Sequence, residues 1–276
     1  MPITDRIDPD LLKDIPNLPM EKQREILSLL EELENAESKE VARDSYLSFI
    51  KRVWPAFIEG SHHKIMAKAF ERVANGELKR LIINMPPRHT KSEFASYLLP
   101  AWFLGRFPEK KIIQTAHTAE LSVGFGRKVR NLVDSDDFKE LFPRVALRAD
   151  SKAAGRWSTN EGGEYFAIGV GGAVTGKGAD LLIIDDPHSE QEGQSADPSV
   201  FDKVYDWYTS GPRQRLQPGG AIIVVMTRWH KRDLTGQIIK SSVQRKGTDE
   251  WEVIEFPAIL PSGNALWPQF WPKEEL

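Results

Sequence analysis

The sequence predicts an α/β fold with a mostly parallel central sheet flanked by helices, and a helical region in front of it. Three observations lead to this prediction. Short runs of β-branched and other apolar residues recur along the chain, stretches with helical spacing of apolar residues separate them, and several of the runs end abruptly in polar residues. Apolar runs that alternate with helices are typical of strands in a parallel sheet.

Length and composition fit one such domain. The 276 residues are 40% hydrophobic and contain no apolar run long enough to cross a membrane, so we expect a soluble protein. The 37 basic and 40 acidic residues give a net charge of -3, which neither requires nor excludes a nucleic-acid partner. Without cysteine there is no disulfide framework, thiolate metal site or cysteine nucleophile, and no signal peptide opens the chain, which favours an intracellular location.

The N-terminal region is expected to be an extended arm followed by two helices. Residues 1–19 are polar and punctuated by proline. The first helix carries Ile26, Leu27, Leu30 and Leu33 at helical spacing, and the second, which Pro55 ends, carries Val41, Tyr46, Phe49, Ile50 and Val53. We place the boundary between this region, residues 1–44, and the main domain, residues 45–276. The helices are interpreted as a packed hairpin covering the sheet, or alternatively as a docking surface for a partner subunit.

A further helix opens with two adjacent histidines, His62 and His63, and ends near Asn75-Gly76. A metal pair is disfavoured, because adjacent residues on a helix point in different directions and no third ligand lies at suitable spacing. We expect one of the two to lie near the base of a nucleotide held by the segment that follows.

That segment, residues 81–99, has a strand, a short loop and a helix in direct succession. The apolar run from Leu81 stops at Asn84, the loop ends in Lys91-Ser92, and helical spacing of apolar residues begins at Phe94. This is the context of a phosphate-binding loop, since free backbone N–H groups and the positive end of the helix dipole favour an anion. Lys91 would reach the β- and γ-phosphates of ATP and the Ser92 hydroxyl would coordinate Mg²⁺. The expected nucleotide contacts are Pro87, Arg88, His89, Thr90, Lys91, Ser92 and Glu93.

The loop lacks both glycines of the usual G-x-x-x-x-G-K-[ST] pattern, with Met85 and Thr90 in their places. A solvated basic turn is therefore the alternative interpretation. If the loop needs a positive φ at Thr90, a β-branched residue there costs about 1–3 kcal/mol of strain. Thr90→Gly should then be tolerated or improve nucleotide affinity, unless the Thr90 side chain makes a contact of its own.

The middle of the chain continues the strand and helix alternation. A strand at 111–116 precedes a helix at 119–133, which carries Arg127 and Arg130. The stretch from Gly155 to Gly178 contains eight glycines around one short apolar run, residues 164–168. We interpret it as a hairpin and loop over the active face, too rich in turn residues for a core element.

An acidic strand end completes the expected nucleotide site. Residues 180–187 form a buried-type run that ends in Asp185, Asp186 and Pro187. We expect Asp185 to hold Mg²⁺ together with Ser92, and Asp186 to position the attacking water, with Glu190 and Glu192 as alternatives for that role. A mere acidic turn is the competing interpretation.

The most hydrophobic strand, residues 221–226, also ends in polar residues. An aromatic helix at 201–210 precedes it, and a helix beginning at Asp233 and a last strand at 251–256 follow. Thr227, Arg228 and His230 come directly after the strand, where a γ-phosphate can be sensed, so we assign them to coupling. The alternative is a surface turn.

Several of these stretches, taken in order, resemble the ATPase domain of a tailed-phage terminase large subunit, a DNA-packaging motor. They are Pro-Pro-Arg-His-x-Lys-Ser at 86–92, Thr-Gly-Lys-Gly-Ala-Asp at 175–180, Leu-Leu-Ile-Ile-Asp-Asp-Pro at 181–187, Met-Thr-Arg-Trp-His-Lys-Arg-Asp-Leu-Thr-Gly at 226–236, and an ending with Ala-Leu-Trp-Pro at 265–268 and Glu-Glu-Leu at 274–276. The resemblance covers residues 45–276. It departs at Thr90, where such loops usually carry Gly, and at Lys177, where many relatives carry Arg.

The resemblance implies a P-loop NTPase fold of the ASCE type and ATP hydrolysis, with Mg²⁺, coupled to moving double-stranded DNA into a procapsid. The implied partners are the portal protein, a small terminase subunit and further copies of the chain in a ring, expected to be a pentamer, in the host cell cytoplasm; no membrane is implied. The nuclease domain that follows in such proteins is expected to be absent, because the sequence stops where it would begin.

The resemblance also implies a poorly active isolated domain, because motors of this kind complete their site with a cation. Arg88 is the candidate in cis and Lys177 the candidate in trans, with Arg127, Arg130 and Arg156 as less favoured donors. Three other functions stay open: a helicase-like translocase, although no Asp-Glu-x-His or Asp-Glu-x-Asp box is present; a small-molecule kinase; and a nucleotide-binding adaptor without turnover.

Overall fold

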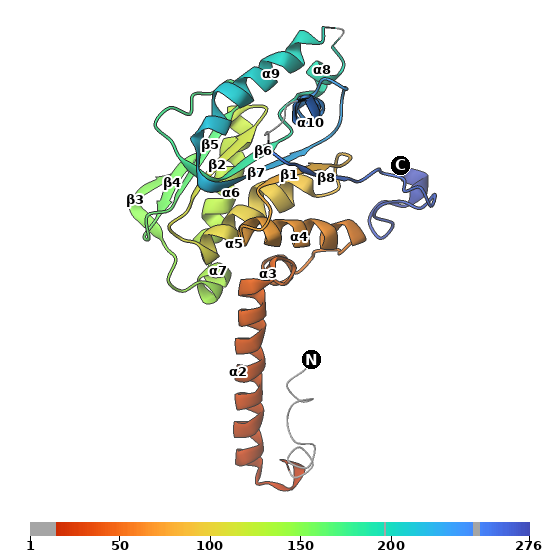
Figure 1. Ribbon diagram of the computed structural model, residues 1–276. Coiled ribbons are helices and arrows are strands. Elements are labelled where there is room, and N and C mark those ends of the chain that lie inside the picture. The colour runs from red at the N-terminus through yellow and green to blue at the C-terminus, as the bar shows by residue number, and fades with distance from the viewer. Residues whose placement is uncertain (1–14, 196, 245–248) are drawn as a thin grey trace.

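A computed structural model of the chain describes residues 15–195, 197–244 and 249–276 and has an eight-stranded sheet at its centre (Figure 1). The strands are β1 (Arg80–Asn84), β2 (Lys111–Ala116), β3 (Leu147–Ala153), β4 (Arg156–Thr159), β5 (Glu164–Gly169), β6 (Ala179–Asp185), β7 (Leu216–Met226) and β8 (Glu252–Glu255). Their order across the sheet is β3-β4-β5-β2-β6-β7-β1-β8.

Most of the sheet is parallel. From β5 to β8 each neighbouring pair runs in the same direction, whereas β4 is antiparallel to both β3 and β5. The carboxyl ends of β1, β2, β6 and β7 therefore share one edge of the sheet, where open α/β sheets bind their ligands. This confirms the predicted mostly parallel α/β fold.

Two helical layers cover the sheet, because alternate residues of each strand point to opposite faces. Leu81 and Ile83 of β1 belong to the larger core cluster, together with residues of α3 to α7, whereas Ile82 belongs to a second cluster with residues of α9 and α10. No described helix is long and apolar enough to cross a bilayer. The helices of these layers are α3 (Tyr46–Val53), α4 (Ser61–Ala74), α5 (Leu99–Arg106), α6 (Ala119–Val133), α7 (Asp136–Leu141), α9 (Ser199–Ser210) and α10 (Leu234–Gln244), and α8 (Glu190–Gly193) is a single short turn.

The first helix, α2 (Met20–Asp44), does not form the expected packed hairpin. Figure 1 shows it projecting from the body, and the contacts between its described residues and the body lie toward its C-terminal end, as for Lys39 with Glu140 and Arg43 with Leu141. Ala42 is buried, whereas Leu27 and Leu33 are 53% and 52% exposed. The physical reason is length: 25 residues extend about 37 Å, whereas the eight of α3 cover about 12 Å. The hairpin interpretation is wrong for most of α2, and the docking surface stays a prediction.

The predicted strand and hairpin of the glycine-rich stretch are confirmed, but its placement outside the core is wrong, since β5 lies inside the sheet. It pairs in parallel with β2 from Lys111↔Glu164 to Ala116↔Gly169 and forms a hairpin with β4 on its other side. The glycines allow close backbone approach: a Cβ on Gly163 would lie 2.3 Å from the Pro108 carbonyl oxygen, and one on Gly169 2.4 Å from the Ala119 nitrogen. These glycines are needed for packing against neighbouring backbone, but in a sequence they look the same as the glycines of a turn.

Candidate nucleotide-binding site

The segment after β1 is a tight loop that leads directly into a helix. The helix begins at Lys91, and its residues Glu93–Leu98 are wound as a π-helix before α5 continues it. Two non-glycine residues of the loop have positive φ angles, 59° at Arg88 and 66° at Thr90. Alternation of left-handed and right-handed backbone turns successive N–H groups inward, as in anion-binding nests, and π-helical turns are frequent at functional sites.

The hydroxyl of Thr90 forms a hydrogen bond with His63, a contact that the sequence did not predict. The Thr90 hydroxyl lies 2.6 Å from His63 Nε2. His63 Nδ1 accepts a hydrogen bond from the Gly60 N–H at 2.8 Å, so the ring proton is on Nε2 and is donated to Thr90. The contact that would make glycine harmful at position 90 is therefore present.

His62 and His63 lie behind the loop and are fully buried. Burial, reinforced by the charge of neighbouring histidines, lowers the pKa of His63 to about 2 and that of His62 to about 4, so both are neutral at physiological pH. No cluster of three or more potential metal ligands among His, Asp, Glu and Cys occurs in the described residues. His63 contacts Thr90 of the loop after β1, and the expected proximity of one of the two histidines to a nucleotide base stays a prediction.

The C-terminal segment supports the loop from the same side. The Trp271 indole N–H donates to the Arg88 carbonyl at 3.1 Å. The ring of Trp267 lies 5.0 Å from that of His63 and 5.5 Å from that of His62. Because a carbonyl inside the loop is tied to Trp271, the position of this segment affects the conformation of the loop.

Asp185 ends β6 beside the loop helix and is 2% exposed. Its Oδ1 accepts from the Ser92 hydroxyl at 3.0 Å, and its Oδ2 accepts from the Ser96 hydroxyl at 2.7 Å. Ser96 in turn accepts from Gln114 Nε2 at 3.0 Å. Burial and the neighbouring charge of Asp186 raise the pKa of Asp185 to about 7. A buried carboxylate beside a hydroxyl offers the hard oxygen ligands that Mg²⁺ prefers, so this pair fits the metal.

Asp186 makes an ion pair with the loop lysine. Lys91 Nζ lies 2.7 Å from Asp186 Oδ2, and the Lys91 side chain is 7% exposed. The other Asp186 oxygen accepts from the Thr227 N–H at 2.8 Å. Asp186 itself has a φ of 39°, a left-handed conformation that turns its side chain toward the loop. Four of the predicted residues, Lys91, Ser92, Asp185 and Asp186, are thus brought together.

The predicted coupling residues divide into two groups. The Thr227 hydroxyl donates to the Met85 carbonyl at 3.3 Å, at the start of the loop. Arg228 turns away and pairs with Asp233 at 2.9 Å, and the His230 ring stacks on Phe201 with centroids 5.1 Å apart. Asp233 is fully buried and also accepts from two backbone N–H groups of this turn, those of Trp229 and His230.

The glutamates proposed as alternatives to Asp186 have other contacts. Glu192 and Ser189 form a reciprocal capping box at the start of α8, with bonds of 2.9 and 3.1 Å. Glu190 is exposed and lies 3.4 Å from the side-chain amide of Gln194. The carboxylate of Glu192 therefore stabilises its own helix.

The structure does not bring Lys177 to the loop of its own chain. Lys177 precedes β6, so the seven residues of that strand, about 20 Å, separate it from the Asp185 end. Its ammonium pairs with Glu164 at 3.2 Å and lies over the Phe166 ring. Arg88 is exposed at the loop. The less favoured Arg127 and Arg130 lie on α6, and Arg156 begins β4.

The fold agrees with that of large terminases. The crystal structure of the HK97 bacteriophage large terminase matches 79% of this chain with a TM-score of 0.50 and 17% identity, and the chain spans 44% of its length. Two structures of the Thermus phage P74-26 large terminase ATPase domain, one of them a mutant, are also similar. The match to the mutant covers 78% of this chain and 85% of the mutant chain, with 15% identity and a TM-score of 0.45. The match to the other structure covers 68% of this chain and 79% of that chain, with 15% identity and a TM-score of 0.39.

No protein-family model and no curated protein matches the sequence. The family resemblance drawn from the motifs is thus confirmed at the level of the fold, by a structure that shares 17% identity.

Proposed function

We propose that residues 45–276 form the ATPase motor domain of a viral terminase large subunit, which couples ATP hydrolysis to packaging of double-stranded DNA. The observation that carries this proposal is the convergence of Lys91, Ser92, Asp185 and Asp186 at the carboxyl edge of the sheet. Phosphoryl transfer needs mainly positioning and charge neutralisation, which a lysine, a nest of N–H groups and a magnesium-binding carboxylate supply.

Each residue has a defined part in this proposal. The inward-turned N–H groups of residues 88–92 bind phosphate oxygens, and Lys91 leaves Asp186 to neutralise the β- and γ-phosphates. Ser92 and Asp185 would hold Mg²⁺, which would supply charge stabilisation when bound. Asp186, freed from Lys91 and still anchored by the Thr227 N–H, orients the attacking water.

The test compares ATP hydrolysis by Lys91→Ala and Asp185→Asn proteins with that of the parent chain. Lys68→Ala, at an exposed position on α4, is the matched lysine control. We expect both site variants to lose turnover while their circular dichroism spectra match the parent. Substantial hydrolysis by both would contradict the proposal, and unchanged hydrolysis by Asp186→Asn would transfer the water-positioning role to Glu190.

A cation from a neighbouring subunit is the second part of the proposal, with Lys177 as its source in a ring assembled on portal protein and DNA. Mixing Lys91→Ala subunits into a Lys177→Ala preparation should restore turnover, since each supplies what the other lacks. Lys111 shares the Glu164 partner of Lys177, so Lys111→Ala is the matched control. Full activity of dilute monomer, or no rescue despite proven assembly, would leave Arg88 to act alone.

The remaining alternatives have separate signatures. Strand separation would indicate a helicase-like translocase, and ADP release without an added acceptor would argue against a small-molecule kinase. Tight ATP binding without hydrolysis, even with DNA at high protein concentration, would indicate a structural adaptor. The portal protein, the small terminase subunit and the pentameric ring belong to the proposal and would be tested by co-assembly with a procapsid.

A further inference from the structure

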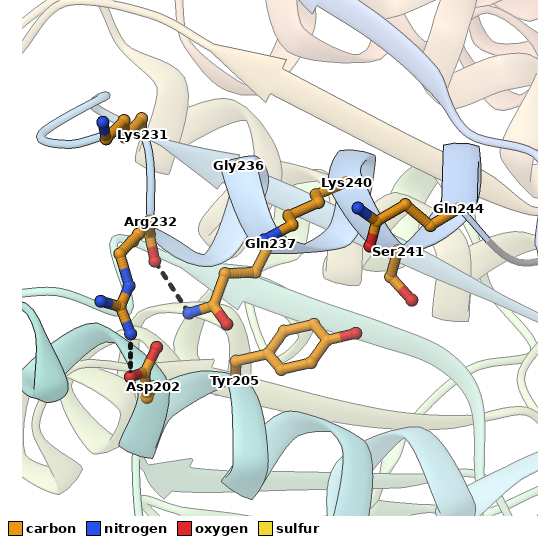
Figure 2. Close-up of a pocket in the computed structure, with 9 residues that line it drawn as sticks. All are labelled: Asp202, Tyr205, Lys231, Arg232, Gly236, Gln237, Lys240, Ser241 and Gln244. Atoms are coloured by element: carbon orange, nitrogen blue, oxygen red, sulfur yellow. Dashed lines mark hydrogen bonds and ion pairs between the residues drawn. The ribbon is translucent and has the colours of Figure 1, made fainter.

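A groove of about 470 Å³ lies between α9 and α10, outside the nucleotide site (Figure 2). Asp202 and Tyr205 line it from α9, whereas Lys231 and Arg232 come from the turn before α10 and Lys240 from α10 itself. No role assigned above uses these side chains.

The groove carries unneutralised positive charge. Arg232 forms an ion pair with Asp202, which cancels the one acidic group among its lining residues. Lys231 and Lys240 are exposed, and neither has a hydrogen bond or ion pair with a residue that the structure describes. Ser241 and Gln244, further along the same wall, add uncharged hydrogen-bond donors. Two free ammonium groups beside neutral donors suit an anionic, phosphate-bearing partner.

The walls of the groove are fixed by internal hydrogen bonds. Gln237 Nε2 donates to the Arg232 carbonyl at 2.8 Å (Figure 2). It also donates to the Phe201 carbonyl at 3.1 Å, which ties α9 to the turn. The Leu234 N–H donates to His188 Nε2 at 2.9 Å. The groove is therefore a built feature of the fold, and its lysines project from a stable frame.

The same turn connects the groove to the nucleotide site. Its first residue, Thr227, contacts Asp186, and Asp186 is the ion-pair partner of Lys91. The buried carboxylate of Asp233 then holds the turn together, and Lys231 and Arg232 lie on it. If Lys91 exchanged Asp186 for a phosphate, the contacts of Asp186 would change, and Asp186 is bonded to the first residue of this turn. The other end of the same turn carries Lys231 and Arg232 of the groove.

We propose that this groove binds the sugar-phosphate backbone of double-stranded DNA, an inference that rests on the proposed motor function. Lys240 follows Leu234 by six residues, about 9 Å along the helix. One DNA strand rises about 3.4 Å per phosphate along the duplex axis, so this length matches the axial rise over two to three phosphates. Lysine, serine and glutamine suffice for backbone contacts, which carry no sequence information and suit a protein that moves along DNA.

The test measures binding of a short fluorescent DNA duplex to the full chain by anisotropy over a range of salt concentrations. The variant is Lys231→Gln/Lys240→Gln, and the charge-matched control is Lys22→Gln/Lys68→Gln, at exposed positions on α2 and α4. Each phosphate contact contributes about 0.9 to the slope of log K against log salt, so loss of two lowers the slope by about 1.8. We expect this loss in the groove variant and the wild-type slope in the control.

Three outcomes would overturn the inference. In the first, the groove variant has the same affinity and the same salt dependence as the control. In the second, the wild-type chain does not bind the duplex at low salt. In the third, the variant loses binding to poly-glutamate but retains binding to the duplex. The last would assign the groove to an acidic protein. ATP hydrolysis by the wild-type chain is scored separately, so an active enzyme with unchanged DNA binding in the variant removes the groove alone.

Discussion

Replacing Thr90 with glycine has two opposing effects on stability: it relieves backbone strain in the loop after β1 and removes the acceptor of the His63 hydrogen bond. Thr90 has a φ of 66°, which is strained for a β-branched residue and free for glycine. Its hydroxyl also accepts the only proton of the fully buried His63 ring, which glycine cannot do. The sign of the change in unfolding free energy therefore depends on which effect is larger.

The strain and hydrogen-bond terms are of similar size, so the flexibility that glycine adds to the unfolded chain decides the sign. Relief of strain gains about 1–3 kcal/mol, whereas an orphaned buried donor costs about 1–3 kcal/mol and the added flexibility of glycine in the unfolded chain about 0.4–1 kcal/mol. We expect Thr90→Gly to destabilise the chain by about 0.5–1 kcal/mol, the balance of these terms. Thr90→Ser keeps the hydroxyl and removes the branch, so it should be as stable as the parent or more so.

The assay is urea unfolding of a double-mutant cycle with His63→Phe, whose ring can keep the stacking on Phe94. Without the imidazole there is no donor to orphan, and Thr90→Gly should then stabilise by about 1 kcal/mol from strain relief. The Gly60 N–H loses its acceptor in both His63→Phe proteins, with Thr90 and with Gly at position 90, so that cost cancels from the comparison between them. Equal effects of Thr90→Gly in the two backgrounds would refute the reasoning.

Three further predictions address the carboxylate, the buried histidines and the coupling turn. Ser96→Ala removes a donor to the Asp185 carboxylate, worth about 1.5–3 kcal/mol, so the magnesium concentration for half-maximal hydrolysis should rise by about tenfold to a hundredfold. Ser122→Ala, which removes a buried serine bound to a backbone carbonyl, should leave that concentration unchanged. Between about pH 6.5 and 4 the unfolded chain binds a proton at His62 that the folded chain does not, so the free energy of unfolding falls on acidification. His62→Phe should reduce that fall by up to about 1.4 kcal/mol per pH unit, measured by urea unfolding at several pH values. An unchanged pH dependence would contradict the burial of His62. Thr227→Ala keeps its backbone bond to Asp186, so it should retain ATP hydrolysis but lose DNA movement in the assembled motor that we propose. Retention of both would support a simple surface turn.

The features that the sequence predicted correctly are those with local signals. A β-branched run that stops before Lys91-Ser92 and another that ends in Asp185-Asp186 each define a strand and the polar group at its end. In a parallel sheet the carboxyl ends of such strands meet at one edge, so their proximity follows from the fold class. The 3.0 Å contact between Ser92 and Asp185 is the structural outcome.

The features that were missed depend on contacts distant in sequence. The bonds of His63 to Thr90 and of Trp271 to Arg88 join residues 27 and 183 positions apart, and no local pattern predicts either. The role of Ser96 had a weak signal, since it lies one helical turn after Ser92 on the face toward Asp185. The placement of β5 was wrong because glycines that permit close backbone packing have the composition of a turn.

The contacts of Asp186 connect the two halves of the proposed mechanism. In this structure both of its carboxylate oxygens are occupied, one by Lys91 and one by the Thr227 N–H. A triphosphate that draws Lys91 away frees the first oxygen for a water molecule and leaves the second anchored to the turn after β7. In the proposed mechanism, the same exchange would free Asp186 to orient the attacking water and would alter the contacts at the start of the turn that carries Lys231 and Arg232. Because Asp186 has both connections, its exchange of partners is a physical route by which nucleotide binding can reach the proposed DNA groove.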